Sequence, residues 1–192
     1  MKKLLLLVSI LAVSGITFAA TTSSDTTGTV DVRAEVVTQL EIVDTTPVDF
    51  GRIAAGQENK PEEKSGSFTI VGSSGKNIKI TVRDENKSGS QYIDPSNGID
   101  VVLYQDGSLT TITNKQMISK LFLYNNSAKV GNSPLTFGSK ANYYPNSNNA
   151  QPKTKLPLDV KGTLTAGINQ DIGNYQGILG IKAVYTDPVI KK

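Results

Sequence analysis

Short segments in which apolar residues occupy every second position recur along this chain of 192 residues. A period of two places apolar side chains on one face of a β-strand and polar side chains on the other. Turn-forming residues separate the segments, and helical periodicity is almost absent. The predicted strands span residues 29–36, 39–43, 47–53, 67–71, 77–82, 99–104, 121–124, 135–137, 155–160 and 173–185. This pattern predicts an all-β fold, an immunoglobulin-like antiparallel β-sandwich.

Two turn signals predict hairpins between neighbouring strands. Residues 72–75 read Gly-Ser-Ser-Gly between two alternating segments, which predicts a hairpin loop. Asp106 and Gly107 lie between β-forming residues, and because an Asp-Gly pair accepts positive φ it is the strongest hairpin signal in the chain. Residues 114–120 fit one helical turn as well as a strand, and the pattern leaves both open.

The longest predicted strand is the last one, residues 173–185. One of its faces carries Tyr175, Leu179, Ile181, Ala183 and Tyr185. The other face carries Ile178 and Val184, so both faces are partly apolar. Apolar residues on both faces are typical of a strand that is covered on both sides.

The N-terminal residues have the form of a secretory signal peptide. Lys2 and Lys3 precede an apolar run over residues 4–13, and small residues follow as far as a predicted cleavage site after Ala19. The run is shorter than the ~20 apolar residues that a membrane-spanning helix needs, which disfavours an anchor. The sequence therefore predicts an exported protein.

The predicted organisation is a signal peptide over residues 1–19, an N-terminal extension over residues 20–37 and one immunoglobulin-like domain over residues 38–192. The chain has no cysteine, so the exported domain has to be held by its core and its sheet hydrogen bonds. It also has no histidine, which removes the usual general base and the commonest zinc ligand. We therefore predict neither an enzyme nor a cofactor.

The charge balance points away from nucleic acid. Lysine and arginine number 20 against 17 acidic residues, and removal of Lys2 and Lys3 with the signal peptide leaves 20 − 2 = 18 against 17. A chain this close to neutrality, with no basic stripe, lacks the electrostatic footprint of a nucleic-acid-binding protein.

The sharpest alternation in the chain lies close to the predicted new N-terminus, in residues 29–36. Its apolar positions are Val30, Val32, Ala34 and Val36. The preceding residues 21–28 are polar or glycine and offer nothing to pack. A terminal strand of this kind can complete its own sheet or the sheet of a neighbouring molecule, and the alternation alone leaves both open.

Two groups of motifs, one at each end of the chain, carry a resemblance to a known family. The front contains the alternating residues 30–36, Leu-Glu-Ile at 40–42, and Asp-Phe-Gly-Arg-Ile at 49–53. The rear contains Leu-Pro-Leu at 156–158, Leu-Thr-Ala-Gly at 164–167, and Tyr-Gln-Gly at 175–177. In this order they resemble the major subunits of chaperone–usher fimbriae of the colonisation-factor type, and related pilin-like exported domains. Residues 76–155 do not take part in the resemblance.

The resemblance implies an immunoglobulin-like domain that lacks its last strand and exposes a groove lined by core residues. A periplasmic chaperone fills that groove first, and the N-terminal strand of another subunit then replaces the chaperone at an outer-membrane usher. Carried onto this sequence, the donor strand comprises Val30, Val32, Ala34 and Val36. The groove edge comprises Tyr175, Leu179, Ile181, Ala183 and Tyr185.

The function implied is that of a structural subunit of a surface fimbria that supports adhesion, with other copies of itself as partners. The protein would pass through the periplasm to the cell surface. One feature departs from the family: many such subunits have a tyrosine next to last in the chain, whereas here residues 186–192 follow Tyr185. That departure affects how a chaperone would grip the C-terminus.

Other interpretations of the same residues remain open. The chain is alternatively a self-complete exported sandwich that recognises carbohydrate or a host protein, with Tyr143 and Tyr144 as aromatic residues for a sugar face. A hydrolase on the same fold ranks lower, because no pair of carboxylates stands out. The acidic residues between 84 and 100 offer oxygen ligands for calcium, but they lack the spacing of a calcium loop and fit solvated loop acids better.

Overall fold

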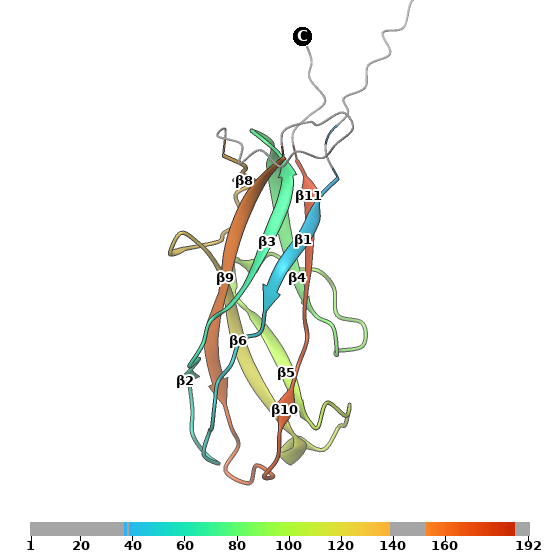
Figure 1. The fold of residues 1–192 in the computed structure, drawn as a ribbon. Helices are drawn as coiled ribbons and strands as arrows, with labels where there is room; N and C mark the ends of the chain where they lie inside the picture. Colours follow the sequence, from blue (N-terminus) through green and yellow to red (C-terminus); the bar gives the residue numbers. More distant parts are fainter. Residues whose placement is uncertain (1–36, 38, 139–152, 187–192) are drawn as a thin grey trace, which may run out of the picture. The chain divides into compact units, whose positions relative to one another are not determined.

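The computed structural model describes residues 37, 39–138 and 153–186 (Figure 1). The chain divides between Ala34 and Glu35 into two units, and the described residues all belong to the second. The predicted signal peptide and the predicted donor strand lie outside the described residues. Within the described ranges, no helix is long and apolar enough to span a membrane.

The described residues form eleven strands and two short 3₁₀ turns. The strands are β1 (Glu41–Thr46), β2 (Lys60–Pro61), β3 (Gly66–Ser73), β4 (Asn77–Asp84), β5 (Ile99–Gln105), β6 (Gln116–Asn125), β7 (Ala128–Lys129), β8 (Leu135–Thr136), β9 (Lys153–Thr165), β10 (Tyr175–Gln176) and β11 (Leu179–Tyr185). The 3₁₀ turns are η1 (Pro95–Asn97) and η2 (Thr113–Lys115).

Two antiparallel sheets contain these strands. The larger sheet has the order β1-β3-β9-β6-β5-β10, with β2 paired to β9 and β7 paired to β6. The smaller sheet has the order β11-β4-β8. Every ladder between named strands is antiparallel. The all-β antiparallel sandwich-like fold predicted from the sequence is thus confirmed.

One hydrophobic core joins the two sheets. The larger sheet contributes Phe68, Ile70 and Leu158, and the smaller sheet contributes Ile78 and Val82, all of them almost inaccessible to solvent. Burial alternates along β4, in agreement with the period of two in its sequence. Burying each large aliphatic or aromatic side chain contributes about 1.5–3 kcal/mol, which is the main stabilising term in a chain without disulfides.

The Gly-Ser-Ser-Gly segment at residues 72–75 is not a hairpin loop, and that prediction was wrong. β3 lies in the larger sheet between β1 and β9, whereas β4 lies in the smaller sheet. Both hydrogen-bonding edges of β3 are therefore already occupied, so β4 cannot pair with it. The segment instead carries the chain from one sheet to the other.

The hairpin predicted at Asp106 and Gly107 is confirmed, although its loop is longer than two residues. Asp106 and Gly107 have φ of 53° and 69°, and the Ser108 N–H donates to the Gln105 carbonyl over 3.1 Å. β5 and β6 form an antiparallel hairpin as predicted, but the connection continues through η2 before β6 begins. The ambiguous residues 114–120 consequently form the end of a 3₁₀ turn followed by strand.

The predicted last strand is interrupted, because its two halves belong to different sheets. β10 pairs with β5 in the larger sheet, and β11 pairs with β4 in the smaller one. Gly177 lies at the change of sheet, where an added Cβ atom would approach the Val102 carbonyl oxygen to 2.8 Å. Only glycine lets the backbone pass this close to β5, which gives the Tyr-Gln-Gly motif a structural reason.

Asp84 links the two sheets at the end of β4. Its buried carboxylate accepts the Val102 N–H of β5 and the Asn86 N–H, each over 3.0 Å. A buried carboxylate is stable only when hydrogen bonds replace its lost hydration. This side chain therefore fixes the smaller sheet against the larger one.

Replacing Asp84 with asparagine tests this link. The amide puts an NH₂ group where one carboxylate oxygen accepted, so a buried backbone N–H loses its acceptor. Asp84→Asn is expected to lower the free energy of unfolding by about 1–3 kcal/mol, measured by urea denaturation. Asp100→Asn, on the exposed side of β5, is the matched control and should change it by less than about 0.5 kcal/mol. Equal effects of the two variants would contradict the assigned role.

Candidate functional site

The sandwich has unpaired sheet edges. β1 and β10 are the outer strands of the larger sheet, and β11 is an outer strand of the smaller sheet. In the part of the chain that the structure describes, no strand pairs with β11 on the side away from β4, and none pairs with β1 on the side away from β3. Unpaired edges present rows of backbone donors and acceptors that a further strand can use.

An open cleft lies between these edges. It consists of two adjoining cavities of about 480 and 600 Å³, which share Val48, Phe50, Leu103, Tyr175 and Gln176 in their linings. One wall comes from the chain after the middle of β1, in residues 45–55, and the other from residues 170–181. The floor between them is formed by Val101, Leu103, Met117, Ser119, Leu121, Val160 and Leu164.

Apolar residues on the open edge strands are less covered than their partners in the sheets. Ile42 of β1 pairs with Ile70 of β3 and so shares its face of the sheet, yet Ile42 is 40% exposed and Ile70 is 0% exposed. Ile181 of β11 is likewise only half-buried, although its partner Val82 is buried. The core is therefore incompletely covered along the edges of both β1 and β11.

The residues predicted for the groove edge all pack against the core. Three of them, Tyr175, Leu179 and Ile181, line the cleft, whereas Ala183 and Tyr185 do not. Ile178 and Val184 are exposed, so the expectation that both faces of the segment are covered was wrong. The reason is that a sheet of a two-layer sandwich buries only the face that packs on the other sheet, and its outer face meets solvent.

The Asp-Phe-Gly motif shapes the first wall. The Asp49 carboxylate accepts the Gly51 N–H over 2.8 Å, and Gly51 has a φ of 61°, which glycine adopts without strain. This turn directs Phe50 into the core. The turn prevents a regular strand over residues 47–53, where we had predicted one, and leaves a single bridge between Asp49 and Lys64.

Lys60 holds this wall in place. Its ammonium group donates to the carbonyl oxygens of Phe50 and Arg52, each over 2.5 Å, and pairs with Glu63 over 2.8 Å. The sequence analysis assigned no role to Lys60. The pairing of Asp49 with Gly51 was a detectable turn signal, but nothing in the sequence points to Lys60.

The second wall is held by Tyr175. Its hydroxyl lies 2.8 Å from the Asp171 carbonyl and 3.1 Å from the Asn114 carbonyl, and it accepts from Gln170 Nε2 over 2.7 Å. These contacts fasten the loop before β10 to the η2 turn. The tyrosine of the Tyr-Gln-Gly motif thus orders the wall in which it lies.

The floor of the cleft is apolar except for Ser119. This small, buried side chain donates to the Val101 carbonyl over 3.1 Å, so its hydroxyl is satisfied within the floor. Both neighbours on its face of β6, Met117 and Leu121, are larger. A floor of this composition suits apolar side chains that enter from an added strand.

The acidic residues considered for calcium have other uses. Asp84 binds backbone N–H groups, and Asp94 accepts the Ser96 N–H over 2.9 Å at the start of η1. Among the described residues there is no group of three or more acidic, histidine or cysteine side chains arranged to hold a metal ion. Tyr143 and Tyr144 lie outside the described residues, as do Val30, Val32, Ala34 and Val36.

No protein-family model matches the sequence, and a search of curated proteins found no significant match.

Lys60→Met tests the support of the first wall. Methionine keeps an unbranched apolar stem but removes the hydrogen bonds of the ammonium group, which contribute about 1.5–3 kcal/mol when a charged donor is involved. Because 1.4 kcal/mol corresponds to a factor of ten, trypsin should cut the peptide bond after Arg52 about tenfold faster, as followed by mass spectrometry. Lys64→Met, at an exposed position, should leave that rate unchanged. Equal cleavage rates in both variants would exclude this role for Lys60.

Proposed function

We propose that this protein is a structural subunit of a surface fimbria that assembles by strand exchange between copies. Residues 29–36 of one copy enter the cleft of another as an added β-strand. The protein carries out no chemistry and supports adhesion of the cell that displays it. The observation that carries the proposal is the open cleft with an apolar floor, which lies between sheet edges that no described strand pairs with.

The predicted donor strand suits such a cleft. Eight residues in β conformation extend about 26 Å, and alternate side chains point to the same side. Val30, Val32, Ala34 and Val36 would all face the apolar floor, while the polar residues between them face water. Each fully buried valine contributes about 1.5–3 kcal/mol, in addition to the main-chain hydrogen bonds made with the sheet edge.

The position of the cleft favours donation to another copy. The sheet register aligns Glu41, at the start of β1, with Lys155 of β9 through Val71 of β3. The β9 residues that line the cleft are Val160 and Leu164, which lie further along that strand. The cleft thus begins well beyond the level at which β1 starts.

If residues 29–36 paired with β1 of their own copy, their apolar residues would align poorly with this cleft. If residues 37–40 formed a hairpin loop, Val36 would lie opposite Glu41 and Val30 opposite Pro47. The wall of the cleft runs from residue 45 to residue 55. The alternating apolar residues 30–36 would therefore cover only the first part of this wall. The polar residues before Thr29 would then lie over the rest of an apolar floor. A strand from another copy has no such restriction.

Assembly of this kind gives a fibre. Each copy offers one strand and one cleft, and because the two surfaces differ, the contact is heterologous and need not close into a ring. Before assembly the open edge is an aggregation hazard, so a periplasmic chaperone would cover it until an outer-membrane usher assembles the fibre. The predicted signal peptide fits export through the periplasm to the cell surface.

Complementation in trans tests the proposal. A chain that lacks residues 1–36 should aggregate or have a low free energy of unfolding, because its core is uncovered along the cleft. A peptide copying residues 29–36 should restore a soluble fold and raise Tm, as measured by circular dichroism. At a peptide concentration of about 100 times Kd the stabilisation should be about 2.7 kcal/mol.

The matched control is the same peptide with Val32→Asp and Val36→Asp, which keeps the length but places charges against the floor. It should neither bind nor stabilise. A truncated chain that is a stable monomer with no affinity for the unmodified peptide would favour the self-complete binding module instead.

A larger side chain in place of Ser119, on the floor of the cleft, tests where the strand binds. Ser119→Leu fills space on the floor, and because overpacking costs about 1–3 kcal/mol, peptide affinity should fall about tenfold. Lys120→Leu, on the opposite face of β6, and Ser119→Ala, which removes only the hydroxyl, should both bind normally. Calorimetric titration gives the affinities. Normal binding by Ser119→Leu would place the strand elsewhere.

A further inference from the structure

Four aliphatic side chains are exposed on two loops at one end of the sandwich. Leu109 and Ile112 lie between β5 and β6, and Ile168 and Ile172 lie between β9 and β10, with Ile168 83% and Ile172 100% exposed. We call these four residues the apolar tip. Single exposed aliphatic residues are common on protein surfaces, whereas several on neighbouring loops are a candidate interaction surface.

Hydrogen bonds hold the two loops together. The Asp171 N–H donates to the Asn114 carbonyl over 2.9 Å, and Asn114 Nδ2 donates to the Asp171 carboxylate over 2.8 Å. Gln105 Nε2 donates to the Ile172 carbonyl over 3.0 Å. These hydrogen bonds thus fix the two loops that carry the apolar tip.

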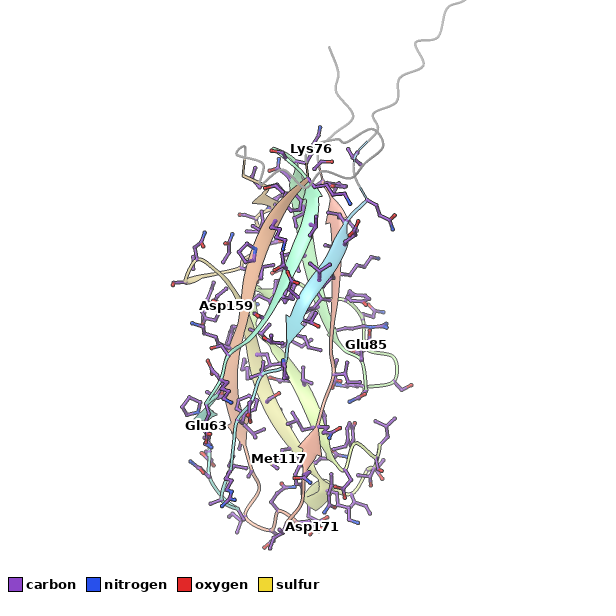
Figure 2. The ribbon with its side chains drawn as sticks, viewed as in Figure 1. Glu63, Lys76, Glu85, Met117, Asp159 and Asp171 are labelled. Carbon is purple, nitrogen blue, oxygen red and sulfur yellow. The ribbon has the colours of Figure 1, made fainter. Side chains whose placement is uncertain are left out.

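The apolar tip adjoins one end of the cleft and lies far from the start of β1. Ile172 itself lines the larger cavity. The start of β1 is level with Lys155, whereas Thr165, ten residues further along β9, is paired with Ile118 near the tip. Ten residues of strand extend about 33 Å. Figure 2 accordingly labels Asp171 and Lys76 at opposite ends of this part of the chain.

We propose that the apolar tip binds the β-sandwich of the neighbouring copy that donates its strand. This inference rests on the proposed function. The length of the tether supports this occupant. Only residues 37–40 separate Val36 from the start of β1, and five backbone steps reach at most about 18 Å. The body of the donor copy must therefore lie against the end of the cleft from which its Val36 emerges.

A donor strand that pairs antiparallel with β11, the strand that carries the predicted groove residues, would leave the cleft at the apolar tip. β11 follows β10 and runs away from the tip loop, and each ladder between named strands of the described residues is antiparallel. A strand added antiparallel to β11 runs toward the tip, so its last residue leaves the cleft there. The donor copy then presents the start of its own β1, where Val37 and Ile42 are exposed and apolar.

Cysteine cross-linking tests this contact, since the natural chain has no cysteine. The full chain with Gln39→Cys and Ile172→Cys is assembled and treated with a short bismaleimide. A ladder of covalent multimers is expected, because each copy links its start of β1 to the tip of the next. Each single variant should give dimers at most. Gln39→Cys with Asp159→Cys, an exposed residue on the middle of β9, should give no ladder.

A second pair of variants separates tip binding from strand binding. Leu109→Ser with Ile168→Ser changes two tip residues that do not line the cleft, so peptide affinity should be unchanged while assembly of the full chain weakens about tenfold. Val184→Ser, an exposed residue on β11, should affect neither. Fibres that form without the Gln39–Ile172 ladder would overturn the inference and leave strand exchange intact. Absence of both peptide binding and assembly would overturn strand exchange and this inference with it.

Discussion

The backbone hydrogen bonds at a sheet edge are the constraint on which the rest of this structure depends. A strand with a neighbour on one side only leaves alternate N–H and C=O groups unpaired, and water or another strand has to satisfy them. In this sandwich the edges of β1 and β11 flank the same cleft, whose floor is apolar. Among the described residues, backbone pairing and side-chain burial are therefore both incomplete at this cleft.

The walls of the cleft are held by polar contacts, although its floor is apolar. Asp49 and Lys60 fix one wall through backbone atoms, and the Tyr175 hydroxyl fixes the other. Such contacts keep a cleft open against collapse of its apolar lining, which would otherwise reduce the exposed area. A wall held by such contacts loses less conformational entropy when it binds a partner than a free loop would.

Much of the fold was predictable from the sequence because strands have a simple period. The alternation in β3, β4, β5 and β9 located those strands, and the positive φ of Asp106 and Gly107 was correctly inferred. The crossing at residues 72–75 was not predictable, because which sheet a strand joins depends on partners far away in the sequence. Lys60 was missed for the same reason, since its acceptors are backbone carbonyls that carry no residue signature. The alternation also could not show that the last segment changes sheets at Gly177.

The passage of one short segment between two sheets has a thermodynamic consequence. Residues 175–181 contribute β10 to the larger sheet and the start of β11 to the smaller one, and they form one wall of the cleft throughout. A molecule bound along this wall contacts both sheets at once. Its binding free energy is therefore shared by both, and by mass action occupancy of the cleft opposes the opening of either sheet. Loss of the occupant would in turn lower the resistance of the two sheets to unfolding together.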